Sequence, residues 1–231
     1  MKTLGLIGGL GPASTVNYYE KIVYTFKNTR EDEYYPHILI SSLNMEKFIR
    51  QLDFEDYNQV ENILLEEIES LERAGADIIA IASNTAHVVI DNLKEDLNIP
   101  IISIIDCVID EIIKNDYKKV LLTGTSFTMT HDFYIKKLEE NGLKCIIPNS
   151  EDIQKIHEII YPNLENGIIL PYKKEDYIKI INKIIENNDI DCLLLACCEL
   201  NLLINEEDIK IPIIDSENVH IKRILKEISK K

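Results

Sequence analysis

Long apolar runs are missing from this sequence, and none approaches the roughly 18 residues that a membrane-spanning helix needs. Glycine and proline are scarce, at 8 and 7 of 231 residues, so the composition gives no reason to expect disorder. Basic residues are outnumbered by acidic ones, 25 to 40, and the net charge of −15 argues against nucleic acid or an anionic membrane as a partner. An anionic small molecule remains possible as a substrate, because a few hydrogen-bond donors in its binding site can outweigh the repulsion from the net negative charge of the protein.

Targeting and metal-binding signals are absent as well. Met1 leads directly into the strand-like run Lys2–Ile7, so we expect no signal peptide and predict a cytoplasmic protein. The five cysteines lack CxxC spacing and no HExxH motif is present, so we predict neither a metal site nor disulfides. Three of these cysteines are expected to be packing residues. They occupy positions 107, 145, 192, 197 and 198.

Short apolar runs alternate with longer amphipathic stretches, which is typical of an α/β fold. The stretch Tyr57–Ala74, for example, has apolar residues at positions 60, 63, 64, 68 and 71, which predicts a helix. Eight runs read as buried parallel strands. They are Thr3–Ile7, His37–Ser41, Ile78–Ala82, Ile101–Ile104, Val120–Thr123, Lys144–Ile147, Cys192–Ala196 and Ile211–Ile214.

An internal repeat organises these strands. The segment 76–84 aligns with 190–198 at an offset of 197 − 83 = 114, and Pro100 aligns with Pro212 at an offset of 112. The strand ending at Gly8 aligns with the strand ending at Gly124, at an offset of 116. Three landmarks in one order at nearly one offset predict two similar Rossmann-like α/β units with parallel sheets. We assign residues 1–103 plus 213–231 to the first unit and 104–212 to the second, with the helix Val219–Ser229 packing on the first.

Two equivalent turns follow from this repeat, at Ser83 and at Cys197. Ligands of parallel sheets bind beyond the carboxyl ends of the strands. If the units are related by pseudo-twofold symmetry, the two turns flank one cleft, which would be the active site. Two groups on opposite faces of one bound carbon are what stereochemical inversion needs, and we expect them roughly 7–8 Å apart.

The first turn, Ser83-Asn84-Thr85, follows a buried strand and opens a predicted helix. Hydroxyl, amide and free backbone N–H groups at a helix N-terminus can bind a carboxylate, although the same residues also make an ordinary N-cap cluster. His87 lies one turn further on. We expect it to be a packed, hydrogen-bonded histidine rather than a catalytic base.

The second turn, Cys197-Cys198-Glu199, places polar residues directly after four apolar ones. A thiol at a helix start has its pKa lowered by the helix field, so we predict that Cys197 is a usable base or nucleophile. Glu199 could pair with a cationic ammonium group, or simply complement the helix dipole.

The segments that follow the strands ending at Gly8 and Gly124 supply further candidate binding residues. Gly8-Gly9-Leu10-Gly11-Pro12 matches neither GxGxxG nor a Walker motif, so nucleotide binding is not predicted, but Gly9 allows close approach of the backbone to a ligand. The equivalent segment, Gly124-Thr125-Ser126-Phe127-Thr128-Met129, adds two threonine hydroxyls.

Together these motifs resemble the aspartate/glutamate racemase family over essentially the whole chain. Gly8–Pro12 resembles its GGMGP signature, Asn84–His87 its Cys-Asn-Thr-x-His motif from the Asn onward, and Gly124–Met129 its Gly-Thr-x-x-Thr-Met element. Ala196–Leu200 resembles Gly-Cys-Thr-Glu-Leu, and Asp215-Ser216 with His220 resembles the terminal Asp-Ser/Thr…His.

The resemblance implies a racemase that uses no pyridoxal phosphate and no metal, in which two groups on opposite faces exchange the α-proton of an amino acid. Glu199 would contact the ammonium. The α-carboxylate would be held by Asn84, Thr85, Thr125 and Thr128, with Gly9 and Cys198 also lining the site. The protein is expected to be a homodimer with a small-molecule amino-acid substrate.

The departures from the family pattern bear on mechanism. The first catalytic cysteine of the family falls on Ser83, whose hydroxyl is a weak base without a partner. Cys197 would then be the main acid/base residue and turnover could be one-directional. Arg50 could meet a side-chain carboxylate of the substrate, or it could be an ordinary solvated surface arginine. Some aspartate-preferring relatives carry a Lys where this chain has Ile168 after Gly167.

Three functional hypotheses stay open at this point. The first is an amino-acid racemase or one-directional epimerising enzyme acting on aspartate or glutamate. The second is a single-cysteine relative that decarboxylates or isomerises a dicarboxylic acid. The third is a non-catalytic amino-acid-binding protein. An ammonium partner at Glu199 favours an amino acid over a diacid without an amino group.

Overall fold

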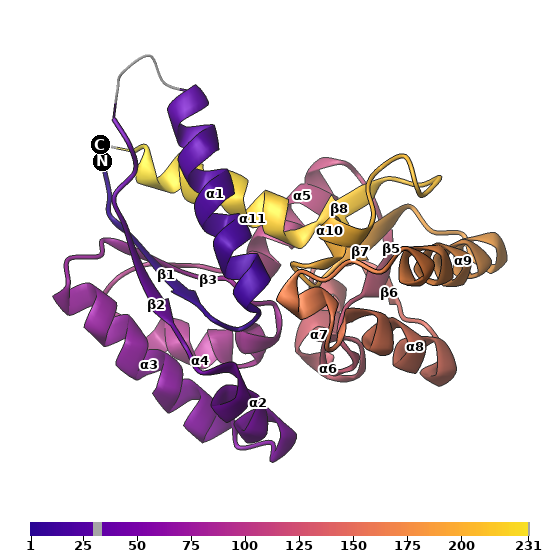
Figure 1. Cartoon of the computed structure of the whole chain (residues 1–231), viewed down its shortest axis with the longest axis horizontal. Coiled ribbons are helices and arrows are strands. Elements are labelled where there is room, and N and C mark those ends of the chain that lie inside the picture. Colours follow the sequence, from indigo (N-terminus) through magenta and orange to yellow (C-terminus); the bar gives the residue numbers. More distant parts are fainter. Residues whose placement is uncertain (30–33, 231) are drawn as a thin grey trace. The chain divides into compact units, whose positions relative to one another are not determined.

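The protein forms two compact α/β units, as seen in a computed structural model that describes residues 1–29 and 34–230 (Figure 1). The first unit contains Met1–Ile104 together with the chain from His220 onward, and the second contains Ile105–Val219. Each unit is built on one four-stranded sheet in which every strand pair is parallel. The predicted pair of parallel α/β units is therefore confirmed.

The first sheet has the strand order β2-β1-β3-β4. Its strands are β1 (Leu4–Gly8), β2 (Ile38–Ser42), β3 (Ile78–Ile81) and β4 (Ile101–Ile102). The strands β1 and β3 are fully buried, as expected for strands covered on both faces. The helical elements are α1 (Pro12–Asn28), α2 (Met45–Asp53), α3 (Tyr57–Arg73), the 3₁₀ helix η1 (Thr85–Val89), α4 (Ile90–Asp96) and most of α11 (Ser216–Ile228).

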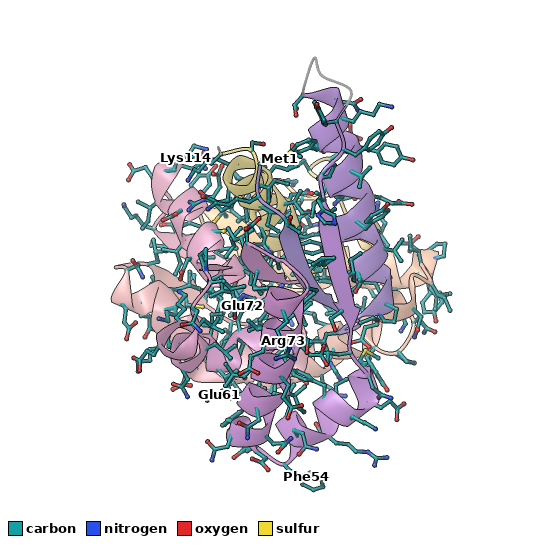
Figure 2. The ribbon with its side chains drawn as sticks, turned by 90° about the vertical axis from the view of Figure 1, so that its left-hand side faces the viewer. Met1, Phe54, Glu61, Glu72, Arg73 and Lys114 are labelled. Atoms are coloured by element: carbon teal, nitrogen blue, oxygen red, sulfur yellow. The ribbon has the colours of Figure 1, made fainter. Side chains whose placement is uncertain are left out.

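The helix α3 shows how the apolar spacing of the sequence becomes packing. Its residues Val60, Leu64, Ile68 and Leu71 are buried, which is one stripe of a 3.6-residue period, and α3 packs on β1 and β2. Figure 2 shows Phe54, in the turn before α3, projecting away from this core, where its side chain is 78% exposed. The predicted helix at 57–74 is therefore confirmed to within one residue.

The second sheet repeats the first with the order β6-β5-β7-β8. Its strands are β5 (Lys119–Thr123), β6 (Lys144–Ile146), β7 (Cys192–Leu195) and β8 (Ile213–Asp215). The helical elements around it are α5 (Ile104–Lys114), α6 (Ser126–Thr130), α7 (Asp132–Glu140), α8 (Ser150–Ile160), the 3₁₀ helix η2 (Leu164–Asn166), α9 (Pro171–Asn187) and α10 (Leu200–Leu203).

The repeat predicted from the sequence extends to individual hydrogen bonds. The Thr3 N–H donates to the Asp77 carboxylate at 2.7 Å, and the equivalent Lys119 N–H donates to Asp191 at 2.8 Å. Ala82 N–H bonds to the β1 carbonyl of Ile7 at 2.8 Å. Its counterpart, the Ala196 N–H, bonds to the β5 carbonyl of Thr123 at 2.7 Å. Equivalent positions thus tie the central strands together in both units.

The unit boundaries differ from the sequence assignment at one end. The first boundary lies between Ile104 and Ile105, one residue from the predicted position. The second lies between Val219 and His220, because β8 pairs with β7 and so keeps residues 213–219 in the second unit. Assigning residues 213–219 to the first unit was therefore a mistake about which sheet receives this strand.

The C-terminal helix packs on the first unit as predicted. In Figure 1 the yellow α11 runs beside α1, and the two helices are joined by a Tyr18–His220 hydrogen bond of 2.8 Å. At the end of α11 the Ile228 carbonyl accepts from the Lys2 N–H at 3.1 Å. Within residues 1–29 and 34–230, no helix is both long and apolar enough to cross a membrane.

Candidate active site

Ser83 lies just past β3, where its side chain is 7% exposed. Its Oγ accepts from the Ala86 N–H at 3.4 Å, and its carbonyl accepts from His87 Nδ1 at 2.7 Å. The segment that follows is the five-residue 3₁₀ helix η1, which runs directly into α4. The turn therefore opens a helical segment, as the sequence predicted, but its first residues are 3₁₀ rather than α-helical.

His87 is a structural histidine, which confirms the expectation from the sequence. The Ile104 N–H donates to its Nε2 at 3.1 Å, so Nδ1 must carry the proton that it donates to the Ser83 carbonyl. Burial lowers the His87 pKa to about 4 and keeps the ring neutral. His87 therefore fixes the backbone of the Ser83 turn and has no ring nitrogen left for catalysis.

His220 is a second buried histidine, and its ring centroid lies 6.3 Å from that of His87. Its Nε2 donates to the Ile102 carbonyl at 2.9 Å, so Nδ1 accepts from the Tyr18 hydroxyl. Burial, followed by the nearby His87, lowers the pKa of His220 to about 3. The terminal histidine of the racemase-like pattern thus ties α11, α1 and β4 together.

These two histidines make the stability of the protein sensitive to acid. Unfolded histidines take up protons below pH 6.5, whereas His87 and His220 resist protonation until about pH 4 and pH 3 in the folded chain. Stability is therefore highest above pH 6.5 and falls as the pH decreases, by about 2 kcal/mol for each histidine at pH 5. Urea unfolding between pH 7 and pH 5 measures this. His87→Asn should flatten the pH dependence by about half, and an unchanged slope would contradict the assignment.

Asn84 and Thr85 continue the Ser83 turn. Asn84 is 4% exposed and its carbonyl accepts from the His87 N–H at 3.0 Å, whereas Thr85 is half-buried. The Ser14 hydroxyl bonds to the Ala82 carbonyl at 3.3 Å, which joins the first turn of α1 to the residue before Ser83. The structure therefore places Ser83, Asn84 and Thr85 together at the end of β3, beside the start of α1.

Gly9 lies in the loop after β1, but its backbone N–H already has a partner. It donates to the Thr15 Oγ1 at 2.8 Å. Gly9 adopts φ +80°, and a Cβ there would meet the Leu43 carbonyl oxygen and would lie 2.6 Å from the Leu43 nitrogen. The glycine is thus required by the fold of the loop, and its N–H could serve a ligand only by leaving Thr15.

Replacing Gly9 with alanine should destabilise the first unit. The positive φ costs roughly 1–2 kcal/mol, and overpacking against Leu43 adds on the order of 1–3 kcal/mol. Gly142→Ala is the matched control, because Gly142 has a similar φ of +74° but open space around its Cβ position. Equal losses of unfolding free energy in the two variants would contradict the steric argument.

Arg50 does not join this group in any interaction that the structure records. It lies in α2 with an exposed side chain, and its carbonyl accepts from the Phe54 N–H as part of the helix C-cap. Its proposed contact with a substrate carboxylate stays a prediction.

Cys197 lies just past β7 in the second unit and is 6% exposed. Its Sγ donates to the Glu199 carboxylate at 3.1 Å, and Glu199 is itself 5% exposed. Cys197 also belongs to the hydrophobic core cluster of this unit, beside Tyr177 and Leu200. The thiol and the carboxylate thus form a buried hydrogen-bonded pair at the end of the sheet.

The prediction that the helix field lowers the pKa of Cys197 is wrong for the protein without substrate. Burial, and then the charge of Glu199, raise the pKa of the thiol well above its usual value. The helix after the turn, α10, has only four residues and cannot offset these two effects. The resting thiol is therefore protonated.

Replacing Glu199 with glutamine should lower the pKa of the Cys197 thiol, because it removes the nearby negative charge while burial remains. Thiolate absorbance at about 240 nm, followed from pH 7 to pH 11 with Cys197→Ala as the blank, would measure the shift. A titration unchanged by Glu199→Gln would contradict the claim that this carboxylate holds the thiol in its protonated form.

Thr125 and Thr128 lie at the neighbouring strand end, after β5. Thr125 caps α6 by accepting from the Thr128 N–H at 3.4 Å, and the two hydroxyl oxygens are 3.1 Å apart. A Cβ on Gly124 would lie 2.8 Å from the Ala196 carbonyl oxygen. The threonine turn and the Cys197 turn are therefore directly adjacent.

Cys198 is buried, like Cys197. It is one of the groups that raise the pKa of the buried Tyr134 in α7, after burial itself, and it contributes to the raised pKa of Cys197 as well. Among the described residues, no group of three or more histidine, cysteine, aspartate or glutamate side chains could hold a metal ion.

Two further residues near Cys197 were missed by sequence reasoning. The Tyr177 hydroxyl of α9 lies 2.7 Å from the Thr123 Oγ1, and Tyr177 belongs to the same buried cluster as Cys197. Glu165 of η2 has a pKa raised to about 7 by burial and then by Glu199. Neither follows a strand or belongs to a recognised motif, so nothing in the sequence pointed to them.

Known proteins with similar sequences indicate the family to which this chain belongs. Residues 7–224 match the family model described as Asp/Glu/Hydantoin racemase. The chain belongs to this family. It is 28% identical to the broad specificity amino-acid racemase RacX of Bacillus subtilis, over 92% of each chain.

Solved structures agree with this assignment. An aspartate racemase homologue from Pyrococcus horikoshii is 39% identical and superposes with a TM-score of 0.87 over 100% of both chains. The aspartate racemase of Picrophilus torridus is 27% identical, with a TM-score of 0.78 over 100% of this chain and 96% of the other. The family resemblance stated from the sequence is confirmed, and the relatives are amino-acid racemases.

Proposed function

We propose that this protein is an amino-acid racemase or epimerising enzyme in which Cys197 exchanges the α-proton, with aspartate and glutamate as the first candidate substrates. The observation that carries the proposal is the buried Cys197–Glu199 pair at a strand end, in a chain of the Asp/Glu/Hydantoin racemase family. Aspartate and glutamate come from the family description. The broad specificity of the Bacillus relative adds other amino acids to those worth testing.

The resting thiol must lose its proton before it can act as a base, and the substrate itself can cause this. An ammonium group bound to Glu199 would neutralise the charge that helps raise the pKa of Cys197. The thiol could then release its proton to solvent, and the thiolate could accept the α-proton of the substrate. Substrate binding would therefore activate the base.

The α-C–H of an amino acid is only weakly acidic, so the developing carbanion needs stabilisation. In the proposal, Asn84, Thr85, Thr125 and Thr128 bind the α-carboxylate. Preorganised donors around a carboxylate stabilise charge that spreads onto it in the transition state. These residues lie at the strand ends of the two sheets, which supports the assignment. No cofactor is needed for this chemistry.

Ser83 occupies the position opposite Cys197 in the proposal, where it or a water molecule would return a proton on the second face. A serine hydroxyl does not ionise near neutral pH, so abstraction from that side should be slow. We therefore expect rapid hydrogen exchange with one enantiomer and little net inversion.

Incubation of amino acids in D₂O tests the function. Loss of the α-proton signal in ¹H NMR, across aspartate, glutamate and a panel of other amino acids, is the expected result. Loss of carbon dioxide from a dicarboxylic acid would favour the single-cysteine decarboxylase instead. Thermal stabilisation by an amino acid without any exchange would favour a non-catalytic binding protein.

A further inference from the structure

Glu165 is an acidic residue close to the candidate site that no part of the proposed mechanism uses. It lies in η2, a short helix anchored by the buried Leu164 and ended by Gly167 at φ +75°. The helix η2 packs against α10, which begins directly after Glu199. The residue therefore belongs to the same side of the second unit as the Cys197–Glu199 pair.

The carboxylate of Glu165 is incompletely paired. Its Oε2 is shielded from solvent and accepts no hydrogen bond from any described residue. A buried acceptor without a donor is unfavourable, and more so when it is charged. The pKa of Glu165 is raised to about 7 by burial and then by the charge of Glu199, so the two carboxylates repel each other. A cation placed between them would relieve both effects.

We propose that Glu165 is a second partner, beside Glu199, for the ammonium group of the amino-acid substrate. This inference rests on the proposed function and extends it. An ammonium group carries three N–H donors, and the Oε2 of Glu199 is already the acceptor of the Cys197 thiol. Glu165 supplies a further acceptor and a further negative charge at the point where the substrate is positive.

Binding should then be coupled to proton release. At pH 7 a carboxyl group with a pKa of about 7 is protonated in about half of the molecules. A bound ammonium favours the charged form of Glu165, so Glu165 should release about half a proton per site at pH 7, in addition to any proton released by the Cys197 thiol. This contribution of Glu165 distinguishes a direct partner of the ammonium from a residue that only shapes the loop.

The test compares Glu165→Gln with the wild-type protein and with Glu186→Gln, a matched control on the exposed face of α9. The probes are L-aspartate, L-glutamate and whichever amino acid exchanges fastest in D₂O, each also as its N-acetyl derivative, which lacks the positive charge. Isothermal titration at pH 7 in buffers of different ionisation enthalpy gives the dissociation constant and the number of protons released. Glu165→Asp, which keeps the charge, serves if the glutamine variant does not fold.

We expect Glu165→Gln to raise Kd and KM for the amino acid about tenfold, to leave kcat within about threefold, and to reduce the proton release at pH 7 by about half a proton per site. Glu186→Gln and the N-acetyl probes should show no such change, and Glu165→Asp should retain the proton release. Unchanged Kd and proton release in Glu165→Gln, or a loss of kcat alone, would overturn the inference while leaving the racemase proposal intact. If no amino acid binds to or exchanges with the wild-type protein, the proposed function fails and the inference fails with it.

Discussion

Replacing Cys197 with alanine is expected to reduce α-proton exchange by about 10²–10⁴-fold, the usual contribution of a positioned acid/base group. The reason is that Cys197 is the group that removes and returns the α-proton in the proposed mechanism. Cys197 is the thiol at the end of β7 that is hydrogen-bonded to Glu199, the proposed partner of the substrate ammonium. The initial rate of α-deuteration by ¹H NMR measures the effect, with the amino acid that the wild-type protein deuterates fastest.

Two further variants make this result specific. Cys145→Ala removes a thiol from β6 in the same unit and should keep the wild-type rate, because Cys145 lies outside the candidate site. Cys197→Ser should leave at most a trace of exchange, since a hydroxyl is a far weaker base than a thiolate. A rate in Cys197→Ala that matches Cys145→Ala would exclude Cys197 as the acid/base residue.

Replacing Ser83 with cysteine is expected to have the second largest effect, in the opposite direction. The new thiol should accelerate exchange from the slow enantiomer by about 10²-fold and allow net inversion in both directions. The geometry of the turn should survive, because His87 fixes the Ser83 backbone through its carbonyl and not through the side chain. Chiral chromatography of the products, combined with deuterium exchange, measures both quantities.

A thiol added elsewhere should not have this effect. Ser70→Cys on the exposed side of α3 is the matched control. If Ser83→Cys leaves the slow enantiomer unchanged, Ser83 does not reach the second face of the substrate. If Ser83→Ala instead abolishes all exchange, the serine is activated by a partner that the proposal does not include.

The fold could be predicted from the sequence because its signals are local. All eight predicted strands exist, and the runs at Ile78–Ala82 and Cys192–Ala196 became the central strands β3 and β7. The repeat was visible because equivalent positions, such as Asp77 and Asp191, keep the same hydrogen bonds. The assignment of β8 to a unit failed because strand pairing is a long-range property, and Ile213 pairs with Leu193.

The candidate site could be predicted only in part. Positions after buried strands, such as Ser83 and Cys197, follow from the topology of parallel sheets. The acidity of Cys197 could not be predicted, because burial and the neighbouring Glu199 raise its pKa, and both depend on the folded environment. Glu165 was missed for the same reason, since only the fold brings η2 against α10.

The rate of α-deuteration of each pure enantiomer, measured separately with the unmodified protein, tests the central claim most directly. Acid/base chemistry at one thiol predicts rapid deuteration of one enantiomer, slow deuteration of the other, and little net inversion during the fast phase. Equal deuteration rates for the two enantiomers, or no deuteration of any amino acid, would contradict it.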